Sequence, residues 1–245
     1  MKTRTYVKTI ACFVSGTVLA FSGAAQAAVV VNDDFSSGTL DGWNVVSGSW
    51  SVIDFNGSNV AEATSGNSQL QTVFSSSIVS AFTINFDYGW EWGVNDFTLQ
   101  LGVKLLDNGG NGYAYTIRQA AAGYKYELFT VTGGADTSLL VSGNAPSESG
   151  GQPLVGASLT WDGTTLRGYQ GGDLVISTSP GLQYDTFNQL VLQQVGLNGH
   201  ARFDNIVVDV TAVPEPGTSV LLGLSLLSVV IMRRRFRRPS CERSL

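Results

Sequence analysis

The sequence predicts an all-β fold, a sandwich of two antiparallel sheets, for the interior of this 245-residue chain. Three observations support this prediction. Apolar and polar residues alternate in the most regular segments, these segments are short, and each ends at a cluster of turn-forming residues. No interior segment repeats its apolar residues at the period of a helix. We expect helices only outside the sandwich, as an N-terminal signal helix and a C-terminal single transmembrane helix.

The chain opens with a secretory signal. Basic residues near the start precede an apolar stretch, residues 10–21, and the small residues Ala25 and Ala27 then occupy the positions that signal peptidase reads. We therefore expect export through the Sec translocon and removal of residues 1–27 by signal peptidase. The mature domain would cover residues 28–212.

Alternation is clearest between residues 82 and 105. Its first half would place six large apolar groups on one face of a strand: Phe82, Ile84, Phe86, Tyr88, Trp90 and Trp92. Its second half repeats the pattern with Phe97, Leu99, Leu101, Val103 and Leu105. Polar or small residues, Lys104 among them, lie opposite these apolar groups. Each strand is thus expected to have one buried face and one solvent-facing face.

Further short strands are expected along the rest of the interior. They cover residues 113–118, 124–131, 139–142, 158–161, 166–170, 174–178, 189–195 and 201–210. Turn clusters separate them at residues 107–112, 133–134, 162–163 and 171–172, where glycine, asparagine and aspartate favour tight turns. The longest expected loop covers residues 142–153.

The chain ends in three consecutive parts. Pro214-Glu215-Pro216 comes first, an uncharged apolar run over residues 217–232 follows, and Arg233, Arg234 and Arg235 begin a basic cluster. At about 1.5 Å per residue the apolar run reaches roughly 24 Å as a helix, enough to just span a membrane. The arginines stay on the cytoplasmic side, so everything before Pro214 would lie outside.

This tail, residues 213–238, resembles the PEP-CTERM sorting signal of Gram-negative, exopolysaccharide-producing bacteria. In that family an exosortase, a membrane enzyme, reads the motif, the helix and the basic cluster and releases the protein to the surface. The resemblance implies exosortase as a partner and a transient inner-membrane anchor with the domain in the periplasm. It also implies a final place on the cell surface or in the extracellular biofilm matrix. The pattern does not account for the short tail at residues 239–245.

Removal of both ends would leave an acidic domain. Residues 28–213 contain five basic and seventeen acidic residues, a formal charge of −12. Such a surface repels nucleic acid, because no basic stripe can neutralise phosphates, but it is compatible with divalent cations and neutral glycans. Both cysteines, Cys12 and Cys241, lie in segments to be removed, so the secreted part needs a hydrophobic core rather than disulfides.

Three segments of the domain resemble laminin-G and concanavalin A-like jelly rolls. Residues 34–50 resemble the first strands of that group, residues 159–175 its hairpins with an Asp-Gly turn and a second glycine-rich turn, and residues 202–208 its final strand. The resemblance implies two stacked antiparallel sheets whose last strand pairs beside the first. In some relatives a concave face of this fold binds sugars.

The sequence offers no catalytic residue. Glycanases of this group carry a Glu-x-Asp-x-x-Glu strand, whereas here only Glu91 and Asp96 lie near each other, and solvated turn acids are the better interpretation. The one histidine, His200, precedes the last strand, and no Gly-x-Ser-x-Gly elbow supplies a nucleophile. Cofactor and phosphate-binding loops are also missing from the sequence.

Calcium is the one cofactor that the acids suggest. Asp33 and Asp34, together with Asp204 or Asp209 on a final strand that pairs nearby, could supply carboxylate oxygens to a structural site. The alternative is that these acids lie exposed on edge strands and discourage aggregation. The sequence leaves both interpretations open.

The aromatic residues pose a similar choice between core and binding surface. Trp43, Trp50 and Trp90 are expected to pack in the sandwich. Trp92, beside Gly93, and Tyr169, before a glycine-rich turn, are the candidates for a sugar-binding rim.

Two function classes follow. The first is an exported, non-catalytic surface or matrix protein that associates with extracellular polysaccharide through a lectin-like domain. The alternative is a secreted glycan-active enzyme of the same fold, similar to glycoside hydrolases. The missing acid motif favours the first class, although fold alone does not fix function.

Overall fold

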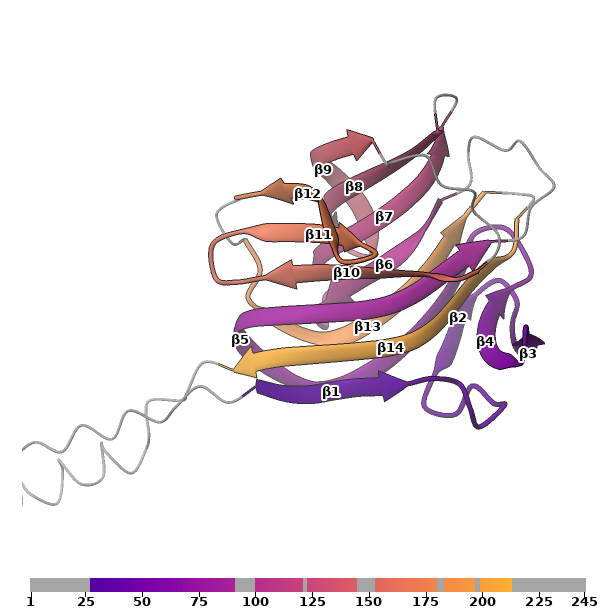
Figure 1. Cartoon of the computed structure of the whole chain (residues 1–245). Helices are drawn as coiled ribbons and strands as arrows, with labels where there is room; N and C mark the ends of the chain where they lie inside the picture. Colours follow the sequence, from indigo (N-terminus) through magenta and orange to yellow (C-terminus); the bar gives the residue numbers. More distant parts are fainter. Residues whose placement is uncertain are drawn as a thin grey trace, which may run out of the picture. The chain divides into compact units, whose positions relative to one another are not determined.

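The computed structural model describes residues 27–90, 100–120, 123–144, 153–179, 183–196 and 199–212. Figure 1 shows that these residues form an all-β sandwich, as the alternating pattern predicts. The expected signal helix and transmembrane helix both lie outside the described residues. Within the described ranges, no helix is long and apolar enough to cross a membrane.

The strands of the described ranges are numbered in chain order. They are β1 (Ala27–Asp33), β2 (Asn44–Ser47), β3 (Trp50–Phe55), β4 (Ser58–Ala63), β5 (Ser68–Trp90), β6 (Gln100–Leu106), β7 (Gly112–Ala120), β8 (Gly123–Thr132), β9 (Ala135–Asn144), β10 (Val155–Trp161), β11 (Leu166–Gln170), β12 (Asp173–Thr178), β13 (Thr186–Val195) and β14 (Ala201–Ala212). Every pairing among them is antiparallel, for example between β5 and β13 and between β6 and β7.

The long strand β5 belongs to both sheets of the sandwich. Its first part, from Ser68 to Ile78, pairs with β13 and β2, and its second part, up to Trp90, pairs with β10 and β14. One sheet therefore has the order β12-β11-β10-β5-β14-β1, which we call the front sheet because it faces the viewer in Figure 1. The hairpin of β3 and β4 extends this sheet through pairing of β4 with β14. The other, the back sheet, has the order β2-β5-β13-β6-β7-β8-β9.

The first and last described strands lie side by side. Ala27 of β1 pairs with Thr211 of β14, and the pairing continues to Asp33 opposite Ile206 (Figure 1). The implied pairing of the last strand beside the first is therefore correct. Both ends of the domain leave the sandwich at the same edge.

The core lies between the two sheets and is rich in aromatic rings. Phe86 of β5 contacts Tyr115 of β7 at 6.2 Å between ring centroids, and Phe82 contacts Phe187 at 5.5 Å. In the second half of β5, from Phe82 to Trp90, the inward positions are all at most 5% exposed, as alternation requires. These large rings, and not a disulfide, hold the sheets together.

Two local expectations differ from the structure. Residues 34–43, which resemble opening strands, form a loop, because Asp33 accepts a hydrogen bond from the amide of Phe35 at 2.8 Å and turns the chain. Lys104 was expected on a solvent-facing strand face, yet it is only 3% exposed. It is paired with Asp136 at 2.8 Å and donates to the Gly134 carbonyl, which allows a charged side chain to be buried.

Candidate functional site

A groove crosses the outer face of the front sheet. It has a volume of about 360 Å³ and is lined by residues of β5, β10, β14 and the β11–β12 turn: Asn85, Phe86, Asp87, Gly156, Ala157, Ser158, Gly171, Gly172 and Asn205. Since Phe86 and Ala157 point into the core, the groove mostly presents polar side chains and glycine backbone.

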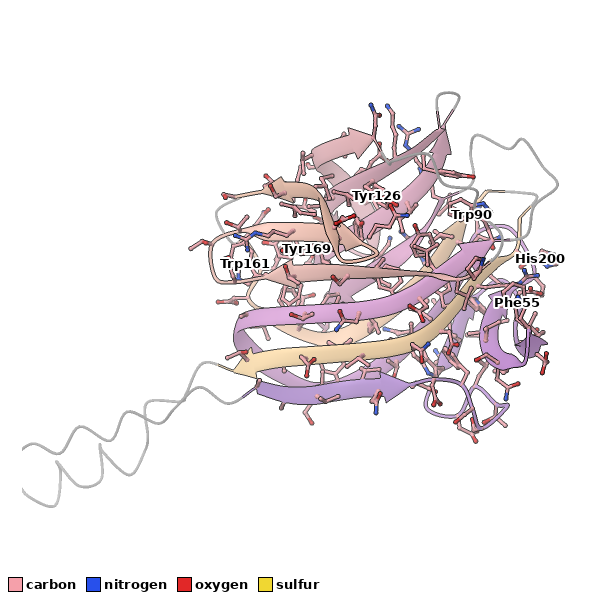
Figure 2. All side chains as sticks on the ribbon, viewed as in Figure 1. Phe55, Trp90, Tyr126, Trp161, Tyr169 and His200 are labelled. Carbon is pink, nitrogen blue, oxygen red and sulfur yellow. The ribbon has the colours of Figure 1, made fainter. Side chains whose placement is uncertain are left out.

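Register brings these residues together from distant parts of the sequence. Ser158 of β10 lies opposite Asn85 of β5 on one side and opposite Tyr169 of β11 on the other. Neighbouring strands are about 4.8 Å apart, so the three side chains form a row across the outer face. Tyr169 is therefore adjacent to the groove, one strand beyond Ser158. Figure 2 shows the position of Tyr169 in the sandwich.

The groove presents hydrogen-bonding groups that the protein does not use. Within the described part of the chain, the Asn85 amide and the hydroxyls of Ser158 and Tyr169 make no hydrogen bond. Asp87 accepts a single hydrogen bond, from Asn205 Nδ2 to its Oδ2 at 2.7 Å, which leaves Oδ1 available. Unused donors and acceptors beside an aromatic ring suit a ligand with many hydroxyl groups.

A bulge in β14 places Asn205 at the groove. The register between β14 and β5 shifts between Asp204 and Val207, and Asn205 has a positive φ of 49°. Its backbone nitrogen donates to Asp204 Oδ1 at 2.8 Å, and its side-chain Nδ2 donates to Asp87 Oδ2. The two hydrogen bonds fix the position of one wall of the groove.

The opposite wall is the turn between β11 and β12. Gly171 and Gly172 both have positive φ, 56° and 90°, a conformation that residues with a side chain rarely adopt. The amide of Gly171 donates to the Gly156 carbonyl at 2.8 Å, which holds the turn against β10. The turn is thus built from residues that leave the groove open.

Tyr169 is supported from the core side. The Tyr115 hydroxyl donates to the Tyr169 carbonyl at 3.2 Å, and the Tyr115 ring packs under Gly168. A Cβ added at Gly168 would meet this ring at 2.7 Å, so glycine is needed for the close approach. The backbone that carries the Tyr169 ring is therefore rigidly placed.

Acidic groups cluster beside the groove. Asp204 lies directly opposite Asp87 and is only 3% exposed. Burial raises the pKa of Asp204 above its usual value, the Asn205 amide and the Ser58 hydroxyl oppose the rise, and the charges of Asp87 and Asp34 add to it. Asp34, which accepts hydrogen bonds from Ser36, has a lowered pKa.

The structure does not gather the four acids expected to bind calcium. Asp33 instead anchors a loop, because its Oδ2 accepts a hydrogen bond from Trp43 Nε1 at 2.7 Å. Asp209 lies opposite Val29, four residues along β1 from Asp33. Among the residues that the structure describes, no three histidine, cysteine, aspartate or glutamate side chains form a group that could hold a metal ion.

Of the other residues singled out in the sequence, some are buried as expected and some lie outside the described residues. Trp90 is buried, and Trp43 and Trp50 are partly buried against the core, as expected. Trp92 lies outside the described residues, as do Glu91, Asp96, Ala25 and the sorting-tail residues Pro214, Glu215, Pro216, Arg233, Arg234 and Arg235.

His200 belongs to an ionic cluster away from the groove, in the right-hand part of Figure 2. Its Nδ1 lies 3.2 Å from Glu62 Oε1, while Arg202 Nε binds Glu62 Oε2 at 2.6 Å. The guanidinium of Arg202 also covers the Phe55 ring at 4.3 Å. The cluster ties the β3–β4 hairpin to β14.

Solved structures share this fold at low sequence identity. They include the carbohydrate-binding module CBM66 from Bacillus subtilis, with 19% identity, a TM-score of 0.50, and coverage of 67% of this chain and 93% of that one. The CBM2 module of the evolved Dit of Lactobacillus casei BL23 phage J-1 has 11% identity, a TM-score of 0.60, and coverage of 77% and 98%. The catalytic domain of a laminarinase from Thermotoga petrophila RKU-1 has 13% identity, a TM-score of 0.56, and coverage of 76% and 98%.

These likenesses define the class of the domain as a jelly-roll sandwich. Residues 212–238 match the PEP-CTERM protein-sorting motif. The chain therefore carries a PEP-CTERM sorting motif after a jelly-roll domain, and this motif indicates a secreted, envelope-targeted protein. No curated protein sequence matches it.

Proposed function

We propose that this protein is a non-catalytic, glycan-binding protein of the cell surface or extracellular matrix, sorted by an exosortase. The observation that carries the proposal is the groove, where Asn85 and Ser158 offer unused hydrogen-bonding groups next to the Tyr169 ring. Sugars bind proteins through hydroxyl hydrogen bonds and through packing of a ring face on an aromatic side chain. Extracellular polysaccharide is the natural ligand of a protein sent to this location.

The route to the surface follows from the ends of the chain. The signal segment would start export, and the apolar run at residues 217–232 would hold the protein in the inner membrane with its domain in the periplasm. Exosortase would then act near Pro214-Glu215-Pro216 and release the domain. The sorting motif matched at residues 212–238 supports this order of events.

The carboxylates beside the groove favour binding over hydrolysis. Glycoside hydrolases commonly need two carboxyl groups flanking the scissile bond, roughly 5 to 10 Å apart. Among the described residues that line the groove, Asp87 is the one acid. Asp204, opposite it, is buried and accepts hydrogen bonds from Ser58 and Asn205, so it faces no substrate.

A glycan array probed with the full chain, purified in detergent, tests the proposal. We expect binding to at least one polysaccharide, about tenfold weaker binding for Tyr169→Ala, and a similar loss for Asn85→Ala. Tyr184→Ala removes a partly buried tyrosine outside the groove and should bind like the wild type. Unchanged binding by both groove variants, or release of shortened sugars from the bound glycan, would contradict the proposal.

A further inference from the structure

We infer that the groove binds glycans without anionic groups and rejects uronic and sulfated ones, with Asp87 as the residue that sets this selection. The inference rests on the proposed function and names the class of ligand that the groove takes. It follows from the charges at and around the groove.

The one formal charge among the described residues that line the groove is negative. Asp87 lines it, and its Oδ1 has no hydrogen-bond partner within the described residues. Asp204 lies directly opposite Asp87 on the neighbouring strand, and Asp34 is close enough for its charge to act on Asp204. An anionic sugar in the groove would therefore meet the Asp87 carboxylate directly, with the Asp204 carboxyl group on the neighbouring strand behind it.

The cations that the structure describes near these acids are already paired with other carboxylates. Among the described residues that line the groove, none is lysine or arginine. Arg167 lies on the same outer face, two positions before Tyr169, but its guanidinium is bound to the Asp162 carboxylate. Arg202, two residues before Asp204 on β14, is bound to Glu62. Both of these described cations are thus paired with a carboxylate, and neither is left for a sugar carboxylate or sulfate.

Apart from Asp87, the groups left for the ligand are neutral. The amide of Asn85 and the hydroxyls of Ser158 and Tyr169 can each donate and accept, which matches sugar hydroxyls. Asp87 Oδ1 can only accept, so it suits a hydroxyl donor and repels a second carboxylate. Hydrogen bonding therefore favours a sugar ring, while the negative charge of Asp87 favours neutral sugars over anionic ones.

The test uses pairs of probes that differ only in charge. Laminarihexaose, cellohexaose and maltohexaose are each compared with the same glycan oxidised at C6 to the uronic acid, and binding to the full chain in detergent is measured by calorimetry. For whichever neutral glycan binds, the oxidised form should bind about tenfold more weakly at low salt. This difference should shrink as salt is raised to about 0.5 M, because screening shortens the reach of the carboxylates.

Asp87→Asn should bring the ratio of the two affinities toward one. Asp185→Asn removes the same charge from an exposed position outside the groove and should keep the wild-type ratio. Equal affinity of the wild type for neutral and oxidised forms, or an unchanged ratio in Asp87→Asn, overturns the inference but leaves glycan binding intact. Binding to no glycan of either kind on the array or in solution overturns the proposed function as well.

Discussion

Asp204 of β14 lies directly opposite Asp87 of β5, and Asn205 donates one hydrogen bond to each carboxyl group. Two like charges at directly opposed positions of an antiparallel pair destabilise a sheet. Burial adds to this cost for Asp204 and raises its pKa. The pair therefore links the stability of the domain to pH.

We predict that stability falls as the pH rises above the ordinary aspartate value of 3.8 and through the raised pKa of Asp204. In this window the folded state binds more protons than the unfolded state, so deprotonation favours unfolding. Asp204→Asn carries no charge and keeps one of the two oxygens that accept hydrogen bonds from Ser58 and Asn205. In urea unfolding, the free energy of unfolding should fall less between pH 4 and pH 7 for Asp204→Asn than for the wild type.

Asp185→Asn serves as the control, because this acid is exposed and lies outside the pair. Its pH dependence should follow that of the wild type. If Asp204→Asn loses as much stability over this range as the wild type does, the Asp204 carboxyl is not the group responsible.

A second prediction concerns the buried ion pair of Arg202 and Glu62, whose Nε and Oε2 are 2.6 Å apart. Arg202→Met leaves the Glu62 carboxylate buried without its main partner, which should cost about 3 kcal/mol of unfolding free energy. Replacing Glu62 with leucine in the same chain removes the unpaired charge and should recover much of the loss. Chemical denaturation of both variants measures this, and a loss below about 1 kcal/mol in the single variant would contradict it.

A third prediction tests how Tyr169 is held. In Gly168→Ala the new Cβ would lie 2.6 Å from Ile176 Cγ2 and 2.7 Å from the Tyr115 ring, so the strand must move. We expect a loss of about 1 to 3 kcal/mol of stability and weaker glycan binding. Gly156→Ala is the control for stability, because its Cβ would meet only the Asp87 carboxylate, at 3.3 Å. Equal stability of the two variants would show that the space under β11 is not restricted.

The fourth prediction concerns sorting. Replacing Pro214, Glu215 and Pro216 with alanine keeps the apolar run and the arginines, so membrane anchoring should persist. Processing should stop, and immunoblots of cell fractions should show uncleaved protein in the inner membrane. Deletion of residues 214–245 should instead release the domain into the periplasm or medium. A triple-alanine variant that is shortened and released like the wild type would mean that the tail is an ordinary anchor.

The fold could be predicted because apolar and polar residues alternate regularly in the sequence of the central strands. From Phe82 to Trp90 of β5 every second residue is large and apolar and at most 5% exposed. Tyr113, Tyr115 and Ile117 of β7 repeat the sequence pattern, although the residues between them are buried as well. Alternation did not identify β2, β3 and β4, because they are short and mix small polar residues with few large apolar ones; only the resemblance of residues 34–50 to opening strands pointed to the region of β2. Their place depends on pairing with β5 and β14, and no local pattern shows such pairing.

The candidate site was only partly visible in the sequence. Tyr169 could be selected because it precedes a glycine-rich turn, but Asn85, Ser158 and Asn205 come from three strands far apart in the chain. Only the register brings them together. Asn85 does occupy a polar position of an alternating strand, which indicates an outward side chain but not its neighbours. The bulge that exposes Asn205 leaves no recognised signal in the sequence.

The pairing of Ala27 with Thr211 has a consequence for how such a domain can be built into other proteins. Because its two ends meet at one sheet edge, the sandwich can be inserted into a loop of a host protein without stretching that loop. For the same reason a short linker could join the ends, and new termini could be opened at the Gly133-Gly134 turn without cutting a strand. The domain could thus be connected to other segments than a signal segment and a sorting tail, because the position of its two ends permits several arrangements.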